Sequence, residues 1–270
     1  MKLRLIAAAA LVPVLLVVLF VAPKVLTAVV VGILCAIAAY ELLCGTGLVK
    51  HARLVAYTMI YAFLVPIWVH FGMNHYSCMV GILLFACLLF MEIILSGAKL
   101  RFDRIAVCLV AGLIIPYMLS SLVRIMDSIM GRYLILIPFI LAFMSDTGAY
   151  FIGCRWGKHK LAPVISPNKS VEGMVGGLAT VILSMLVYCL VISVGFRLEV
   201  NYFYGILYGL VGGLAGVFGD LCFSAVKRQT GIKDYGKLIP GHGGALDRFD
   251  SMVVVAPIAE ILLIAIPVVN

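Results

Sequence analysis

Nine long apolar runs constrain the fold of this chain more than any other feature of its sequence. They cover roughly residues 5–22, 25–44, 54–71, 79–95, 105–123, 133–152, 174–196, 202–224 and 252–269. Each approaches the ~20 residues that a helix needs to cross the hydrocarbon core of a bilayer. The runs are continuous and lack the alternation of barrel strands. The sequence therefore predicts an all-α integral membrane protein with about nine transmembrane helices.

Composition supports this interpretation. Of the 270 residues, 64% are hydrophobic and only 12% are charged, whereas soluble domains carry about 25% charged residues. This excludes an ordinary soluble enzyme and a disordered chain. Nine spans would leave only ~90 residues for loops and tails, so we expect no separate soluble domain.

The distribution of basic residues predicts the topology. If nine helices alternate in direction, 16 of the 20 Lys and Arg residues fall on one side. Cytoplasmic loops are enriched in Lys and Arg, so we expect a cytosolic N-terminus. The basic start of the chain also resembles a signal peptide, but eight further runs favour a first spanning helix. The net charge of +8 is then mostly a consequence of topology, and we expect no nucleic-acid partner.

Two polar stretches stand out on the predicted cytosolic side. Residues 146–172 and 219–250 together carry 15 of the 32 charged residues. We therefore expect N-terminal transmembrane helices in residues 1–132 and a C-terminal transmembrane region that carries the chemistry in residues 133–270, within one membrane-embedded unit.

The eighth run places an acid near the end of a spanning helix. Four of its residues recur at a spacing of four and so share one helical face: Gly212, Gly216, Asp220 and Ser224. An acid there needs a partner or a wet cavity. A salt bridge to Lys227 or another base is one possibility, and a metal or substrate role is the other. Three further glycines predict close helix packing: Gly205, Gly209 and Gly213.

The stretch after Asp220 alternates acids, bases and glycines, ending in Asp247-Arg248-Phe249-Asp250. Magnesium prefers carboxylate oxygens, phosphates need Lys and Arg, and glycines let backbone N–H groups approach an anion. This pattern is typical of nucleotide phosphate chemistry. Asp247 and Asp250 are expected on one helical face, although Asp250 has a second interpretation as a helix cap.

The other polar stretch contains Asp146, again near a helix end, and residues 166–170 before the seventh run. Hydroxyl and N–H groups at a helix N-terminus form an anion site. The alternative is that Ser170 only caps the helix.

These motifs together resemble a known family. Residues 224–250 read Ser-Ala-Val-Lys-Arg, then Lys233-Asp234, Pro-Gly-His-Gly-Gly and Asp-Arg-Phe-Asp. This pattern, with residues 145–150 and 166–170, resembles the signature of CDP-diacylglycerol synthases, the phosphatidate cytidylyltransferases. The resemblance implies a nucleotidyltransferase that converts CTP and phosphatidate to CDP-diacylglycerol and pyrophosphate. It also implies a homodimer in a bacterial inner membrane, with the active site facing the cytosol.

On this basis we assign roles to individual residues. The predicted catalytic residues are Asp220, Lys227 and Asp247. The leading predicted ligands of two Mg²⁺ ions are Asp220 and Asp247, followed by Asp250 and Asp146. The predicted substrate-binding residues are Ser166, Lys169, Ser170, Ser224, Arg228, Lys233, Asp234, His242, Gly243, Gly244 and Arg248. For His242, a hydrogen bond that fixes the loop is the alternative.

Other functions predict other patterns. A CTP-dependent transferase or kinase acting on another lipid would use the same residue types. A membrane transporter predicts polar residues at mid-membrane and inverted repeats, whereas the polar residues here cluster at one face. A structural scaffold leaves Asp220 unexplained.

Overall fold

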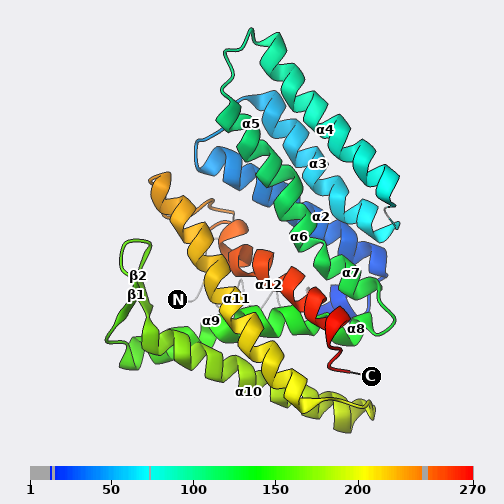
Figure 1. The fold of residues 1–270 in the computed structure, drawn as a ribbon, viewed down its shortest axis with the longest axis vertical. Coiled ribbons are helices and arrows are strands. Elements are labelled where there is room, and N and C mark those ends of the chain that lie inside the picture. Colours follow the sequence, from blue (N-terminus) through cyan, green and yellow to red (C-terminus); the bar gives the residue numbers. More distant parts are fainter. Residues whose placement is uncertain (1–12, 14–15, 73, 239–242, 270) are drawn as a thin grey trace. The chain divides into compact units, whose positions relative to one another are not determined.

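A computed structural model describes residues 13, 16–72, 74–238 and 243–269, which are mostly helical (Figure 1). The chain divides into two compact units. The first comprises Met1–Ser128 and Gln229–Phe249, and the second comprises Ile129–Arg228 and Asp250–Asn270. The second polar stretch is therefore divided between the two units.

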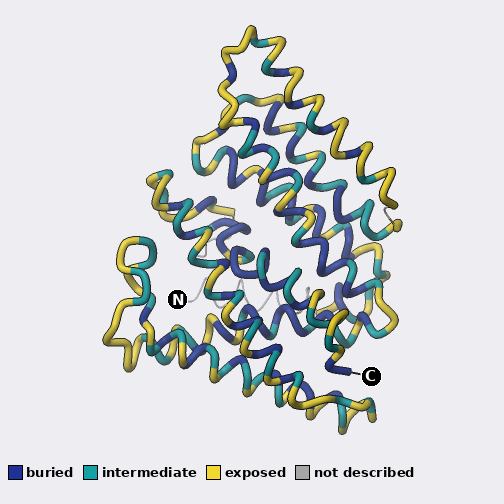
Figure 2. Tube along the Cα trace, in the orientation of Figure 1, coloured by how far each residue is buried: buried dark blue, intermediate teal, exposed yellow. Residues whose placement is uncertain are grey.

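The helices of the first unit come mostly from the N-terminal half of the chain. They are α2 (Lys24–Tyr40), the π-helical η1 (Glu41–Gly45), α3 (Ala52–His70), α4 (His75–Leu95), α5 (Phe102–Leu109), the π-helical η2 (Val110–Ile114), α6 (Ile115–Leu119) and α7 (Ser121–Asp127). α2 packs along α3. α4 buries only a stripe around Phe85 and Leu89 and leaves most of its apolar surface exposed (Figure 2). Such a surface suits contact with lipid tails.

The second unit is built on three long helices and a hairpin. Its elements are α8 (Gly131–Leu134), α9 (Leu136–Trp156), β1 (Lys160–Ala162), β2 (Ser166–Ser170), α10 (Val171–Phe196), α11 (Tyr202–Gln229) and most of α12 (Leu246–Ala265). α9 packs along α10. A Cβ built on Gly209 would lie 2.7 Å from the Cα of Ile182 on α10. The predicted close packing of the α11 glycines is thus confirmed.

The seven predicted runs from 25–44 to 202–224 coincide with helices of spanning length and composition. Among the described residues these are Lys24–Gly45, Ala52–His70, His75–Leu95, Phe102–Asp127, Gly131–Trp156, Val171–Phe196 and Tyr202–Gln229. The expected span 5–22 lies largely outside the described residues. α12 is helical over 20 residues but is not one of the seven, because its first turns and Glu260 add charge. The total of nine spans and their orientation stay predictions.

The antiparallel hairpin β1–β2 is a finding that the sequence did not predict. Lys160 pairs with Ser170 and Ala162 with Ser166, with an irregular register between them. Its strands have only three and five residues, too few for a recognisable alternation. The hairpin connects α9 to α10 and brings Lys169 and Ser170 to the start of α10.

Candidate active site

A cleft of about 230 Å³ opens in the second unit, where α9, the hairpin, α10 and α11 meet. Its polar lining consists of Asp146 on α9, Asn168, Lys169 and Ser170 on β2, and Asp220 on α11. Met174, Val217 and the ring of Tyr150 contribute an apolar wall. The structure thus brings together predicted residues that are up to 74 positions apart in the sequence.

Asp220 is the centre of this polar cluster. Its Oδ2 forms an ion pair with the Lys169 ammonium group, and its Oδ1 accepts a hydrogen bond from the Ser224 hydroxyl at 3.1 Å. The second contact confirms that residues 220 and 224 share one face of α11. The first shows that Lys169 is a base that pairs with Asp220.

Lys227 lies close to Asp250. Its Nζ lies 3.8 Å from Oδ2 of Asp250, and the two side chains are only 11% and 10% exposed. Asp250 lies outside the seven candidate spans. Burial raises the pKa of Asp250 to about 7, with a further rise from the Asp220 carboxylate and an opposing effect of Lys227. Because α12 begins at Leu246, Asp250 lies inside the helix, and its interpretation as a helix cap is wrong.

The remaining predicted residues of this unit organise the hairpin. Ser170 is the N-cap of α10, and its hydroxyl oxygen accepts a hydrogen bond from the N–H of Gly173 at 3.1 Å. The capping interpretation of Ser170 is therefore confirmed. Arg228 donates from Nε to the carbonyl oxygen of Ile165 at 3.1 Å, which links α11 to the residue before β2. Ser166 begins β2 and is partly exposed.

Glu172, in the first turn of α10, holds the other end of the hairpin. Its carboxylate accepts hydrogen bonds from the N–H groups of Lys158 at 3.0 Å and His159 at 3.1 Å. It also contacts Nδ1 of His159 at 2.6 Å. The sequence did not predict this role, because the partners of Glu172 lie 13 and 14 residues earlier in the chain, across the hairpin.

Glu172→Gln is therefore expected to loosen the hairpin. Replacing the carboxylate by an amide removes the negative charge that strengthens the hydrogen bonds from the N–H groups of Lys158 and His159. We expect the backbone amides of Lys158 and His159 to exchange with solvent deuterium about tenfold faster or more. Glu199→Gln, at an exposed position beyond α10, is the matched control. Unchanged exchange in Glu172→Gln would contradict this role.

The first unit holds the other predicted residues around the start of α12. Oδ2 of Asp247 accepts hydrogen bonds from the N–H groups of Tyr235 at 2.8 Å and Gly244 at 3.0 Å. Asp247 is 8% exposed, whereas Lys233, Asp234 and Arg248 are exposed. Gly243 adopts a φ of 87°, which favours glycine. His242 lies outside the described residues.

The structure adds one residue that sequence reasoning did not single out. Glu41, at the junction of α2 and η1, is only 4% exposed. Oε1 accepts a hydrogen bond from the N–H of Ala245 at 3.0 Å, and Oε2 accepts one from the N–H of Leu246 at 2.7 Å. The available signal was an acid inside the apolar run 25–44.

Asp146 lies in the middle of α9, ten residues before the helix ends at Trp156, so the expectation that it lies near a helix end is wrong. Fold and cleft together define a helical membrane protein with acidic and basic side chains gathered at a cleft between its helices. The chain belongs to the cytidylyltransferase family, whose model matches residues 2–266.

Several curated bacterial proteins are similar to part of the chain. A phosphatidate cytidylyltransferase of Staphylococcus saprophyticus is 46% identical over 136 residues, which are 50% of this chain and 51% of the relative. One from Staphylococcus aureus is 47% identical over 137 residues, 50% of each protein. One from Staphylococcus epidermidis is 46% identical over 134 residues, again 50% of each. The match thus spans about half the length of these relatives.

Proposed function

We propose that this protein is a phosphatidate cytidylyltransferase: it transfers the cytidylyl group of CTP to phosphatidate and yields CDP-diacylglycerol and pyrophosphate. We place the reaction at the cytosolic interface of a bacterial inner membrane. Family membership and the names of the relatives support the reaction. The observation that carries the proposal is the cleft of the second unit, where Asp146, Lys169 and Asp220 converge.

The proposed chemistry needs little from a protein base. An oxygen of the lipid phosphate monoester attacks the α-phosphorus of CTP, the bond from the α-phosphorus to the bridging oxygen breaks, and pyrophosphate leaves. By analogy with phosphorylated side chains, a monoester with a second pKa of about 6 is largely ionised at neutral pH. The main obstacle is repulsion between two polyanions, which positive charge must offset.

The side chains at the cleft suit Mg²⁺. Asp146 and Asp220 supply the hard carboxylate oxygens that Mg²⁺ prefers. Among the described residues, no three His, Cys, Asp or Glu side chains come together as a metal site. Mg²⁺ usually takes its other ligands from water and substrate phosphates, which agrees with this donor set. When bound, it would neutralise charge on the triphosphate. Asp247 and Asp250 stay predicted ligands.

The basic side chains of the second unit have a corresponding proposed role. Lys169 lies at the cleft beside Asp220, where its ammonium group is placed to bind a phosphate oxygen. Lys227 lies one turn further along α11 than Ser224 and is largely buried. Solvent screens the charge of a buried ammonium group less than that of an exposed one, so its attraction to a phosphate oxygen is stronger.

An assay with different acceptors tests the proposal against its alternatives. Purified protein in detergent receives CTP, Mg²⁺ and either phosphatidate or diacylglycerol, and mass spectrometry identifies the lipid product. We expect CDP-diacylglycerol from phosphatidate and no phosphatidate from diacylglycerol. Phosphorylation of diacylglycerol would instead support a lipid kinase. Absence of any CTP turnover, together with solute flux in liposomes, would support a transporter.

A further inference from the structure

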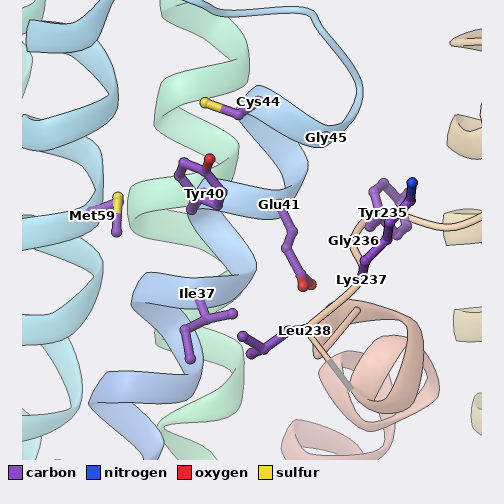
Figure 3. A pocket seen from close by; sticks show the side chains of 10 residues that line it. All are labelled: Ile37, Tyr40, Glu41, Cys44, Gly45, Met59, Tyr235, Gly236, Lys237 and Leu238. Atoms are coloured by element: carbon purple, nitrogen blue, oxygen red, sulfur yellow. The ribbon is translucent and has the colours of Figure 1, made fainter. Parts of the chain in front are cut away.

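The start of α12 is held by a carboxylate from a distant part of the sequence. Glu41 lies 204 residues before Ala245 and accepts one hydrogen bond from each of two consecutive backbone N–H groups. In Figure 3 its side chain extends from its helix toward the segment that carries Gly236 and Leu238. The side chain is almost fully buried, so these contacts are made away from water.

These contacts satisfy a requirement of every helix. The first N–H groups of a helix have no partner within the helix, and they carry the positive end of its dipole. A carboxylate at this position makes charge-assisted hydrogen bonds, which are stronger than neutral ones. Glu41 therefore fixes where α12 begins, and Asp247 and Arg248 follow in the first turn.

Two glycines of the first unit leave the space that Glu41 occupies. A Cβ built on Gly244 would lie 2.5 Å from both carboxylate oxygens of Glu41, and one built on Gly236 would also overlap Oε1. Gly244 does not have a positive φ, so its backbone conformation alone does not require glycine. The space taken by Glu41 explains why residue 244 is a glycine. Close approach of a nucleotide is not needed to explain it.

From Gly244 the connection continues to a predicted catalytic residue. The N–H of Gly244 donates to Oδ2 of Asp247, which also accepts from Tyr235. Glu41 thus holds the backbone at residues 245 and 246. Gly244 leaves room for the Glu41 carboxylate, and the Asp247 carboxylate accepts the hydrogen bond from the N–H of Gly244. These contacts all lie within the first unit.

We propose that Glu41 is a positioning residue for cytidylyl transfer. It orients Asp247 by anchoring the first turn of α12, and Gly244 serves Glu41 rather than the substrate. This inference rests on the proposed function, since it requires Asp247 to act in the reaction.

The first test compares two buried acids of the same unit. Glu41→Gln keeps the shape of the side chain but leaves one of the two N–H groups facing an amide N–H₂. We expect kcat to fall about tenfold or more, with the KM for CTP changed less than about threefold. The control is Glu92→Gln, since Glu92 is 6% exposed and its partners are Arg53 and Tyr57. The Glu92→Gln variant should keep kcat within about twofold of wild type, even if it lowers the melting temperature as much as Glu41→Gln does.

The second test is a double-mutant cycle that needs no catalysis. Gly244→Ala should clearly lower the melting temperature in the wild-type background. In the Glu41→Ala background the loss should be less than half as large, because the Cβ added at residue 244 no longer overlaps the Glu41 carboxylate. Equal losses in both backgrounds would overturn the proposed relation between Glu41 and Gly244. Equal kcat losses in Glu41→Gln and Glu92→Gln would overturn the positioning role.

The two tests separate this inference from the proposed function. If the wild-type protein fails to turn over CTP, the proposed function fails and the positioning role fails with it, while the cycle still reports whether Gly244 accommodates Glu41. If the wild-type protein is active and Gly244→Ala lowers the melting temperature by the same amount in both backgrounds, the proposed relation between Glu41 and Gly244 is wrong. The proposed function then still stands.

Discussion

Asp220→Asn is expected to lower cytidylyl transfer by about 1000-fold while the protein still folds. The substitution keeps the size of the side chain and an oxygen that can accept the Ser224 hydrogen bond. It removes the negative charge that pairs with Lys169 and that is proposed to bind Mg²⁺. The loss should therefore fall on turnover, measured as CDP-diacylglycerol formed from CTP and phosphatidate at saturating substrate.

Asp103→Asn is the matched control for this experiment. Asp103 is an acid near the start of α5, it pairs with Arg101, and its side chain is 58% exposed. We expect activity within about twofold of wild type, because an exposed ion pair contributes little. Both variants should elute from size exclusion as the wild type does. A folded Asp220→Asn variant with near-normal turnover would refute the central role of Asp220.

Asp247→Asn is expected to lower turnover by about 100-fold or more. The amide oxygen of Asn can still accept the hydrogen bonds that Tyr235 and Gly244 donate to Oδ2. The turn should therefore survive while the charge is lost, so this variant separates the chemical role of Asp247 from its structural one.

Asp247→Ala gives the comparison. It removes the acceptor as well and leaves two buried N–H groups without this partner, at about 1–3 kcal/mol each. We expect its melting temperature to fall by several degrees below that of Asp247→Asn. If Asp247→Asn keeps wild-type turnover, Asp247 only stabilises the turn, and its assignment as a catalytic residue is wrong.

The sequence predicted the features that depend on local spacing. Continuous apolar runs located the helices of spanning length, because lipid contact requires length and apolar composition. The spacing of four on α11 predicted the contact between Asp220 and Ser224, and the glycine spacing predicted close packing. Each depends only on helix geometry and on neighbours in the chain.

Features that depend on distant partners were not predictable in this way. The pairing of Lys169 with Asp220 joins residues 51 positions apart through the fold of the hairpin. Glu41 was missed because its partners are backbone N–H groups more than 200 residues away, and no side-chain pattern marks them. Asp250 lies inside α12 because the helix begins six residues before the apolar run that predicted it.

The most direct measurement follows the phosphorus atoms of CTP. Purified protein with Mg²⁺ and phosphatidate receives CTP labelled with ³²P at either the α or the γ position, and lipid and aqueous products are separated. If the protein transfers a cytidylyl group, the α label appears in the lipid and the γ label in pyrophosphate. Appearance of the γ label in the lipid, or of neither label, would contradict the proposed function.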